Sequence, residues 1–352
     1  MNICFCLDSL GAGGAERVAS ILANEFVKSD NKVTIILVSN DSVFYNLHKN
    51  VELVFIDAMH SRNKFKKIFQ LRKTFKKIKP DVVISFFYHI NIYTHLAIKG
   101  LGIRHIVSER NDPNNTKVNY LVKSLKNYIF RHASGSVFQT KDALKYYFPK
   151  DTRRGIIISN PIILKALPYN ELERTKTIFT VGRLTKQKNT ELLIKAFIKS
   201  DCFKQGYKLK IYGDGPLRPA LESFSNKYNK QIFFEGISST WQEKERKAAL
   251  FVLPSNYEGM PNALMEALSL GIPCISTNCP VGGPASLIEH NKNGILIDIN
   301  NENQLINAIN TITNNPSIAL SFSKNNTNYC ERFSPTRIAS AWLNFIKQIL
   351  LN

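Results

Sequence analysis

Two carboxylates, Glu258 and Glu266, stand eight positions apart around a point where the apolar pattern of the chain changes. The apolar run Leu250 to Leu253 predicts a short buried strand of a parallel sheet, after which Gly259 and Pro261 break the pattern. An apolar-periodic helix follows, and a rise of about 1.5 Å per residue separates the two carboxylates by roughly 10 Å along its axis. The two acidic side chains therefore flank the predicted helix start.

The start of this helix is a predicted phosphate site. The first amides of a helix have no partner within it and lie at the positive end of its dipole, so they attract phosphate. Pro261 suits the first helical position, which leaves the next amides to bind an anion, those of Asn262, Ala263 and Leu264. Carboxylates beside a phosphate need neutral partners, and sugar hydroxyls on both sides of a diphosphate would satisfy Glu258 and Glu266.

The residues around the two carboxylates resemble a known family. They form the pattern S-x-x-E-G-x-x-N-x-x-x-E-A-x-x-x-G-x-P, carried by Ser255, Glu258, Gly259, Asn262, Glu266, Ala267, Gly271 and Pro273. This pattern resembles the E-x7-E signature of glycosyltransferase family 4. The resemblance implies that Glu258 bonds the donor sugar and helps to hold an oxocarbenium-like centre, while Glu266 bonds the ribose. As a lone pair, both would be solvated surface glutamates.

A second motif supplies two cations. Arg183 and Lys188 stand five positions apart around a predicted strand-to-helix turn that contains Gly182, and two cations converging there can bind a diphosphate. The run resembles the G-R-L-x-x-x-K motif of the same family, whereas without that context the two would be solvent-exposed charges. Gly213 and Asp214 form another strand-to-helix turn, which in relatives lines the nucleotide pocket. No D-x-D pair accompanies Asp214, so we expect no metal and no other cofactor.

The amino terminus carries a third motif. A buried strand, Ile3 to Leu7, leads through a glycine-rich turn into a helix, which is the usual start of a doubly wound sheet. Glu16 stands where a dinucleotide-binding G-x-G-x-x-G sequence needs a small residue, which argues against a nicotinamide enzyme. The run from Gly13 to Arg17 instead resembles the G-G-A-E-R loop of family 4, and this implies that the Gly13 and Gly14 backbone lies against the donor diphosphate.

Strands alternate with helical stretches along the chain, which predicts α/β architecture with parallel sheets. One series of strands runs from residue 3 to 138 and a second begins at Thr177, so we expect two Rossmann-like domains. The family resemblance implies the GT-B fold, in which such domains face each other across a cleft. We expect an acceptor-binding domain at 1–161, a nucleotide-sugar-binding domain at 162–334 and a helix at 335–352 that crosses back to the first domain, with residues 162–176 as linker.

Composition limits the cellular context. Of the 352 residues, 44% are hydrophobic and 21% charged, as in soluble globular proteins. We find no apolar run of the roughly 18 residues that a membrane span needs, and no basic region at the amino terminus that would mark a signal peptide. The six cysteines show no C-x-x-C spacing, so buried thiols are expected. These features predict a cytoplasmic protein.

Positive charge is concentrated in the first half of the chain. Residues 1–165 contain 26 Lys and Arg against 12 Asp and Glu, and the whole chain carries a net charge of +20. The segment 62–79 contains nine basic residues and no acidic one, and as a helix it places Phe65, Leu71 and Phe75 opposite Lys66, Lys73 and Lys77. Such a helix could bind an anionic membrane or an acceptor diphosphate, or could be a solvated face. No nucleic-acid motif accompanies it, so no nucleic acid is expected.

We also expect Glu16, Arg110 and Asn111 on the acceptor or membrane side. Arg110 and Asn111 follow a predicted strand and occupy a loop where many family relatives carry a histidine that contacts the donor sugar. A turn held by Asx-type hydrogen bonds is the equally weighted structural alternative. His89 ends the preceding strand and could line the same edge, although a lone histidine is more often structural.

The resemblance implies a retaining glycosyltransferase, peripheral on the inner face of the cell membrane. It would move a hexose or N-acetylhexosamine from a nucleotide-diphosphate sugar, expected to be a UDP-sugar, to a polyprenyl-diphosphate-linked acceptor in polysaccharide or glycan assembly. The alternatives are a nicotinamide oxidoreductase, a nucleotide-sugar epimerase, and a non-enzymatic protein that binds nucleic acid or membranes.

Overall fold

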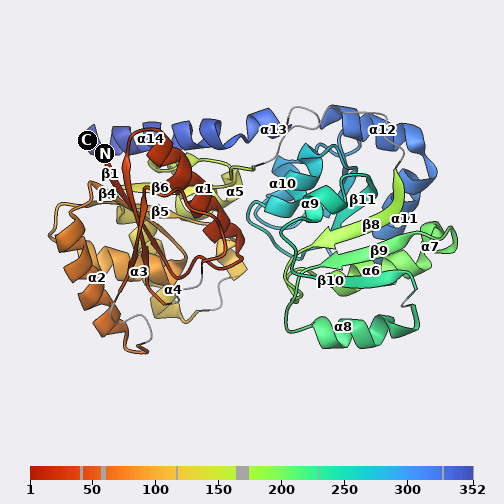
Figure 1. The fold of residues 1–352 in the computed structure, drawn as a ribbon, viewed down its shortest axis with the longest axis horizontal. Coiled ribbons are helices and arrows are strands. Elements are labelled where there is room, and N and C mark those ends of the chain that lie inside the picture. Colours follow the sequence, from red (N-terminus) through yellow and green to blue (C-terminus); the bar gives the residue numbers. More distant parts are fainter. Residues whose placement is uncertain are drawn as a thin grey trace. The chain divides into compact units, whose positions relative to one another are not determined.

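The structure is a computed structural model that describes residues 1–39, 43–56, 61–115, 118–163, 174–228, 230–326 and 329–351. The chain forms two compact units (Figure 1). Unit 1 comprises Met1–Pro161 and Phe333–Asn352, and unit 2 comprises Ile162–Arg332. The division after residue 161 coincides with the boundary predicted from the sequence. Most of the predicted linker, residues 164–173, lies outside the described residues.

Within the described residues, unit 1 contains one parallel sheet of seven strands in the order β3-β2-β1-β4-β5-β6-β7. Its strands are β1 (Asn2–Leu7), β2 (Lys32–Leu37), β3 (Val51–Phe55), β4 (Val82–Phe86), β5 (Arg104–Ser108), β6 (Gly135–Phe138) and β7 (Ile156–Ile157). The central strands β1 and β4 are buried on both faces, which explains why they are apolar except for Asn2 and Ser85. The strand order reverses between β1 and β4, and this reversal is the switch point of unit 1.

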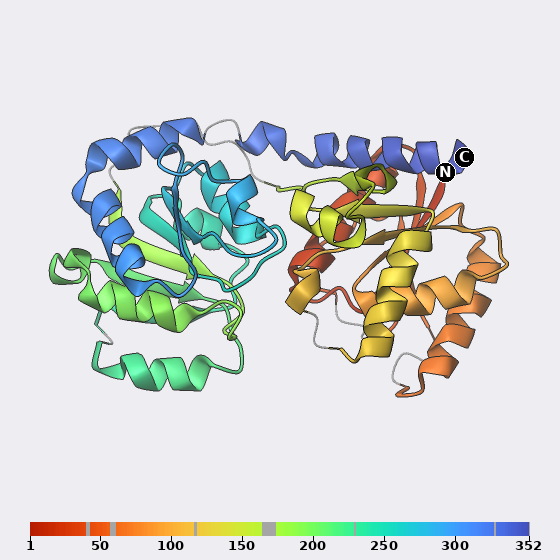
Figure 2. The same ribbon diagram turned by 180° about the vertical axis from the view of Figure 1, so that it is seen from behind.

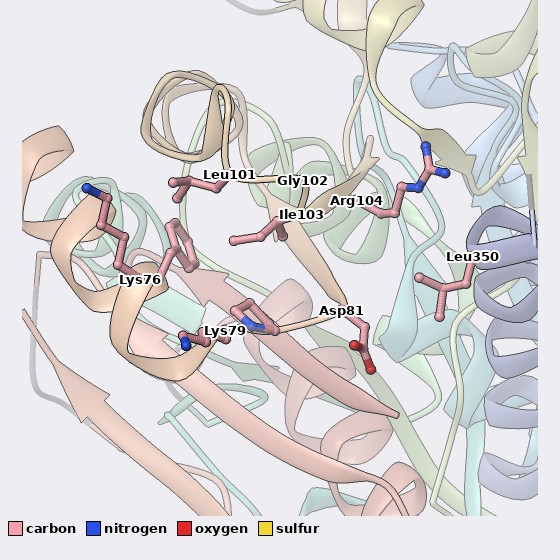
Figure 3. Close-up of a pocket in the computed structure, with 10 residues that line it drawn as sticks. Lys76, Lys79, Asp81, Leu101, Gly102, Ile103, Arg104 and Leu350 are labelled. Carbon is pink, nitrogen blue, oxygen red and sulfur yellow. The ribbon is translucent and has the colours of Figure 1, made fainter.

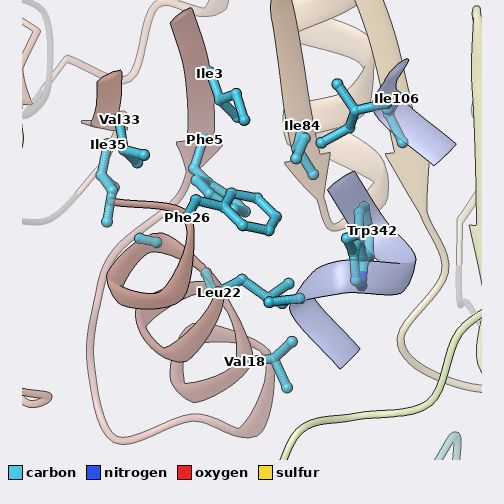
Figure 4. Packing of buried hydrophobic residues seen from close by; sticks show 14 of the residues in the cluster. Ile3, Phe5, Val18, Leu22, Phe26, Val33, Ile35, Ile84, Ile106 and Trp342 are labelled. Carbon is cyan, nitrogen blue, oxygen red and sulfur yellow. The ribbon is translucent and has the colours of Figure 1, made fainter. Parts of the chain in front are cut away.

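Helices cover both faces of this sheet. They are α1 (Gly14–Lys28), α2 (Lys64–Ile78), α3 (Tyr88–Ile98), α4 (Tyr120–His132), α5 (Lys141–Tyr147) and α14 (Pro335–Leu351). On one face, Phe26 of α1 and Trp342 of α14 pack into a cluster with Phe5 (Figure 4). On the other face, which Figure 2 turns toward the viewer, Leu71 and Phe75 of α2 pack on the sheet together with residues of α3. The carboxy-terminal helix is therefore part of the core of unit 1.

Local sequence explains where α2 begins and ends. The side chain of Asn63 accepts hydrogen bonds from the amides of Phe65 and Lys66, at 3.0 and 3.3 Å, and so caps the helix start. Lys79 adopts a left-handed conformation with φ of 50°, and Pro80 cannot continue the helix. The basic segment predicted from the sequence is thus one helix with defined ends.

Unit 2 repeats this architecture. In the part of it that the structure describes, a parallel sheet of six strands has the order β10-β9-β8-β11-β12-β13, with its switch point between β8 and β11. The strands are β8 (Thr175–Val181), β9 (Lys208–Tyr212), β10 (Ile232–Gly236), β11 (Ala248–Leu253), β12 (Cys274–Thr277) and β13 (Ile295–Ile297). The helices are α6 (Thr190–Lys199), α7 (Asp201–Lys204), α8 (Arg218–Ser225), α9 (Trp241–Lys244), α10 (Asn262–Ser269), α11 (Glu302–Asn314), α12 (Pro316–Asn325) and α13 (Tyr329–Arg332).

Candidate active site

A lysine and a glutamate meet at the switch point of unit 2. Lys188 follows β8 and Glu258 follows β11, and the Lys188 Nζ lies 2.5 Å from Oε1 of Glu258. The Ser255 hydroxyl donates to the same carboxylate oxygen at 2.6 Å. The side chains of Lys188 and Glu258 are 22% and 8% exposed, so both charges are largely removed from water. The structure thus joins one predicted cation to one predicted carboxylate.

The two loops that carry this pair are hydrogen-bonded to each other. The backbone amide of Asn256 donates to the carbonyl of Gln187 at 2.8 Å, and the Gln187 side chain donates to the carbonyl of Tyr257 at 3.0 Å. The Asn256 side chain also donates to the carbonyl of Lys186 at 2.7 Å. Because several bonds fix each loop, Lys188 and Glu258 are held in place before any ligand arrives.

Glycines let the backbone segments around the pair approach closely. Gly213 has φ of 125°, and a Cβ there would lie 2.0 Å from the carbonyl oxygen of Gly182. Gly182 in turn lies against the aliphatic stem of Lys188, whose Cε would be 3.1 Å from an added Cβ. A Cβ on Gly283, in the loop after β12, would meet the carbonyl oxygen of Gly259. Side chains at these positions would push the loops apart.

Glu266 lies on the buried side of α10. Glu266 is 1% exposed. Its Oε2 accepts a hydrogen bond from the Gln242 side chain at 3.0 Å. Asn262 and Ala263 begin the helix and are half-buried. Pro261 is the N-cap and not the first helical residue as predicted, because its backbone is still extended with ψ of 106°. The proline side chain has no polar atom to cap the amides that follow.

Arg183 and Asp214 are more open to solvent than the Lys188–Glu258 pair. Arg183 is exposed on the turn after β8. Asp214 accepts hydrogen bonds from the Gly215 amide at 2.6 Å and from the Arg218 side chain at 3.3 Å. Its carboxylate therefore stabilises the turn after β9 in which it lies. Among the described residues, no group of three or more His, Cys, Asp and Glu side chains is placed to hold a metal ion.

Cys279 lies close to Glu258. Burial first, and the negative charge of Glu258 second, raise the pKa of its thiol to about 12. The thiol therefore stays protonated near neutral pH and cannot act as a nucleophile there.

In unit 1, Gly13 and Glu16 form the start of α1. Gly13 is the N-cap, Gly14 is the first helical residue, and the carboxylate of Glu16 folds back over Gly13. A Cβ on Gly13 would lie 2.1 Å from Oε2 of Glu16. An acidic side chain in the first turn is favourable because it faces the positive end of the helix dipole. Glu16 thus has a structural explanation in addition to the predicted acceptor-side role.

Arg110 points into unit 1 and not outward. Its guanidinium lies 4.2 Å from the ring centroid of Phe86 and donates to Asn160 at 2.8 Å. Burial lowers the pKa of Arg110 to about 9. Asn111 is exposed and accepts a bond from the amide of Asp112, whose own carboxylate accepts from the amide of Asn114. These are Asx-type bonds, as in the structural alternative considered for this loop.

The basic helix α2 exposes both lysines and aromatic rings. Lys66, Lys73 and Lys77 all face solvent. Phe65 and Phe69 are 84% and 68% exposed, although the helical pattern had placed Phe65 on the same side as the buried Leu71 and Phe75. The reason is its position in the helix: Phe65 is the second residue of α2, about two turns before Leu71 and about three turns before Phe75, which pack on the sheet.

The sequence analysis considered His89 but not the cluster that it forms at the switch point of unit 1. Asp8 directly follows β1, and His89 lies at the second position of α3 after β4. The two side chains approach to 3.3 Å. The Ser39 hydroxyl bonds the Asp8 carboxylate and accepts a hydrogen bond from Lys67 at 2.8 Å. The signal for Asp8 was a carboxylate placed directly after a buried strand, in the first strand-to-helix turn.

A hollow in unit 1 lies at the opposite, amino-terminal edge of the sheet (Figure 3). Its volume is about 530 Å³, and it is lined by Phe75, Lys76, Lys79, Pro80, Asp81, Leu101, Gly102, Ile103, Arg104 and Leu350. Ligands of doubly wound sheets bind beyond the carboxyl ends of the strands. We therefore assign no substrate to this hollow.

None of the described helices combines the length and apolar character that a bilayer-spanning helix needs.

Two family models match the chain in succession. The model described as Glycosyltransferase Family 4 matches residues 12–162, and the model described as Glycosyl transferases group 1 matches residues 168–329. Together they span both units.

Relatives cover nearly the full length of the chain. A GalNAc-alpha-(1->4)-GalNAc-alpha-(1->3)-diNAcBac-PP-undecaprenol alpha-1,4-N-acetyl-D-galactosaminyltransferase from Campylobacter jejuni is 28% identical over 99% of each chain. The amylovoran biosynthesis glycosyltransferase AmsD of Erwinia amylovora is 24% identical over 94% of this chain and 95% of its own length.

Solved structures show the same fold at low identity. The crystal structure of Anabaena HepE in complex with UDP matches with a TM-score of 0.82 at 15% identity, covering 99% of this chain and 100% of that one. The lipopolysaccharide outer core galactosyltransferase WaaB matches with a TM-score of 0.76 at 22% identity over 99% of both chains. The predicted α/β class and GT-B fold are confirmed, and the oxidoreductase, epimerase and non-enzymatic alternatives are set aside. The chain belongs to the GT-B glycosyltransferases, with a family 4 amino-terminal domain and a group 1 carboxy-terminal domain.

Proposed function

We propose that the protein is a retaining glycosyltransferase that moves a hexose or N-acetylhexosamine from a UDP-sugar to a polyprenyl-diphosphate-linked sugar. The observation that carries this proposal is the Lys188–Glu258 pair, held at 2.5 Å at the switch point of unit 2 by hydrogen-bonded loops. Ligands of such sheets bind at that point. Unit 2 is then the donor domain and unit 1 the acceptor domain.

The donor diphosphate would meet cations and a helix start. When the bond between sugar and phosphate breaks, negative charge grows on the β-phosphate, and fixed positive groups stabilise it. Lys188, the exposed Arg183 and the first amides of α10 supply such groups, and no metal is required by this arrangement. UDP as the nucleotide is supported by the structural neighbour HepE, which was crystallised with UDP.

Glu258 would orient the donor sugar. Lys188 and Ser255 both bond its Oε1, which leaves Oε2 to accept hydrogen bonds from sugar hydroxyls. A negative charge near the anomeric carbon also favours an oxocarbenium-like transition state. In a front-face reaction the bond from the anomeric carbon to the β-phosphate breaks, the acceptor oxygen bonds that carbon, and the acceptor proton passes to the leaving phosphate.

The acceptor would be lipid-linked. Two Campylobacter jejuni relatives, 28% and 26% identical, carry names that specify undecaprenol-linked diphosphate sugars. The exposed rings of Phe65 and Phe69 and the exposed lysines of α2 suit an anionic membrane surface or the diphosphate itself. We therefore place the enzyme at the cytoplasmic face of the cell membrane. No nucleic-acid partner is proposed.

The test is transfer of label from a set of radiolabelled UDP-sugars into a membrane lipid extract. One sugar should appear in a lipid-soluble product, and NMR of that product should show the anomeric configuration of the donor. Glu258→Ala should abolish most of the transfer. Inverted configuration would refute the retaining mechanism, and no transfer from any UDP-sugar would refute the donor assignment.

A further inference from the structure

A glutamine outside the sequence motifs contacts the carboxylate of Glu266. Gln242 is the second residue of α9, and its Nε2 donates to Oε2 of Glu266 on α10 at 3.0 Å; Figure 1 labels both helices. The strand before α9 is β10, which ends at Gly236, so the chain reaches α9 from the carboxyl edge of the sheet. Ligands of doubly wound sheets bind at that edge. Gln242 therefore approaches Glu266 from the side on which a nucleotide is expected.

The chemistry of the pair determines which way the Gln242 amide faces. An ionised carboxylate only accepts hydrogen bonds, so the amide nitrogen must face Glu266 and the amide oxygen must point elsewhere. Both amide atoms are bonded to the same carbon, and the oxygen is thus a second acceptor next to the carboxylate. Within the described residues, the structure records no donor to this oxygen.

Gln242 is the more open member of the pair. Glu266 is 1% exposed, whereas Gln242 is half-buried and presents more surface to a ligand. The preceding residue, Trp241, is buried, and its ring lies 5.5 Å from that of Phe179 on β8, centroid to centroid. This contact anchors α9 to the sheet, so the Gln242 amide is held in place before a nucleotide arrives.

We infer that Gln242 is a specificity-determining residue that binds the ribose diol together with Glu266 and selects ribonucleotides over deoxyribonucleotides. The inference rests on the proposed function, with UDP as the nucleotide and Glu266 at its ribose. Neighbouring ribose hydroxyls provide two donors, and the Gln242 oxygen and the Glu266 carboxylate provide two neighbouring acceptors. A deoxyribose leaves one acceptor without a donor, and it therefore binds more weakly.

The experiment compares nucleotides that differ by one hydroxyl. Calorimetry would measure the affinities for UDP, 2′-deoxy-UDP and 3′-deoxy-UDP. The wild type should bind UDP at least about fivefold more tightly than one of the two deoxy analogues. Gln242→Ala should weaken UDP binding roughly three- to tenfold, as expected for one lost hydrogen bond, and should change the affinity for that analogue little. The preference for UDP should therefore largely disappear.

A second variant separates hydrogen bonding from packing. Gln242→Glu keeps the size of the side chain but places two carboxylates in contact, and like charges raise the pKa of such a pair. Once protonated, the new side chain can donate to Glu266 as the amide does. The UDP affinity of this variant, relative to the wild type, should be reduced at about pH 8 and should recover toward about pH 5.5, whereas Gln242→Ala should show no recovery.

A control variant removes a similar bond elsewhere in unit 2. Nε2 of Gln205 donates to Asn314 at 3.0 Å on the surface, and Gln205→Ala should keep the wild-type affinities for all three nucleotides. Thermal melting checks that the variants fold, and Gln242→Glu decides the matter if Gln242→Ala does not.

Three results would overturn the inference: equal binding of all three nucleotides by the wild type, an unchanged preference for UDP in both variants, or a loss in Gln242→Glu that is the same at both pH values. The last of these would mean that the residue acts through packing alone. Failure of the wild type to bind UDP is a separate result, because it would refute the proposed donor and the inference with it.

Discussion

Each unit carries a carboxylate and a basic side chain at its switch point, but the two pairs differ in construction. Lys188 and Glu258 in unit 2 are 2.5 Å apart and mostly buried, with exposed fractions of 22% and 8%. His89 and Asp8 in unit 1 are 3.3 Å apart and about a third exposed. Glycine backbones surround the first pair, and aromatic side chains surround the second.

The difference matches what each domain would have to recognise. A nucleotide diphosphate is the same chemical group in every reaction cycle. Charged side chains that tight loops already hold in position stabilise it without any rearrangement of the protein. Acceptor glycans vary between enzymes, and side chains that are about a third exposed can change without disturbing the backbone. We expect unit 2 to determine the rate of the chemistry and unit 1 to determine which acceptor is used.

The largest effect should come from Lys188→Gln. Loss of this preorganised cation should lower turnover by on the order of 10²-fold or more. Lys210 is a matched control, because its Nζ lies 2.7 Å from Glu245, and the exposed fractions of that pair are 27% and 2%. Both changes leave a buried carboxylate without its cation and should cost up to several kcal/mol of stability.

The measurements are turnover with a UDP-sugar and urea unfolding of both variants. Only Lys188→Gln should lose turnover, while both should unfold at lower urea concentration. If Lys210→Gln loses as much turnover as Lys188→Gln, the Lys188–Glu258 pair has a structural role alone, and unit 2 no longer differs from unit 1 in the way proposed.

The basic helix of unit 1 should give the next effect. Replacing Lys66, Lys73 and Lys77 with glutamine removes about 1 kcal/mol of attraction to an anionic bilayer per lysine, on the order of 10²-fold in partitioning. The control removes three exposed lysines near α5, at positions 141, 145 and 150, from the same unit. Sedimentation with anionic liposomes should fall only for the α2 variant, and UDP affinity should change in neither.

Two other results are informative. Reduced activity toward a polyprenyl-diphosphate acceptor with unchanged liposome binding would mean that α2 binds the diphosphate and not the bilayer. If neither liposome binding nor acceptor kinetics changes, α2 is a solvated face, and the positive charge of unit 1 has another explanation.

The sequence predicted the fold well because its signals are local. The predicted strand Val82 to Phe86 coincides with the observed one, because a strand buried on both faces is mostly apolar, and Ser85 is the one polar residue of this run. The two-residue strand β7 was missed because two positions carry no period. The family resemblance implied that Gly182, Lys188 and Glu258 line one donor site, and the structure places the three residues in contact.

Side-chain pairing was less predictable because it depends on residues far apart in the chain. Lys188 was expected to act with Arg183 on a phosphate, yet its partner in the structure is Glu258, in a loop 70 positions later. Arg110 turns inward because Phe86 and Trp342 provide aromatic faces, and Trp342 comes from the carboxy-terminal helix. No local pattern around residue 110 contains that information.

A smaller effect should follow from Glu266→Gln. If this buried carboxylate bonds the ribose, its replacement should weaken UDP by roughly 10-fold, in line with one lost hydrogen bond to a charged group. Turnover at saturating donor should change little, because the contact is equal in the ground and transition states. Glu222, which pairs with Arg218 on the surface of unit 2, provides the control as Glu222→Gln. Calorimetry that gives equal UDP affinity for all three proteins would exclude the ribose role.

The last prediction compares the glycine turns of the two units. Gly213→Ala combines φ of 125° with a Cβ 2.0 Å from the backbone oxygen of Gly182, which cannot move aside, and should cost about 1–3 kcal/mol of stability. Gly206→Ala separates the effect of the positive φ from that of the close contact. Gly206 has φ of 79° but nothing within 4 Å of its Cβ position, so this variant should cost less stability.

In unit 1, Gly13 has an ordinary φ of −98°, and its neighbour is the flexible end of Glu16. Gly13→Ala should therefore stay within about 0.5 kcal/mol, the usual difference between N-cap residues of this kind. Urea unfolding of the three variants measures the series, and a cost for Gly13→Ala equal to that of Gly213→Ala would mean that the first turn of unit 1 is as rigid as the donor turns of unit 2.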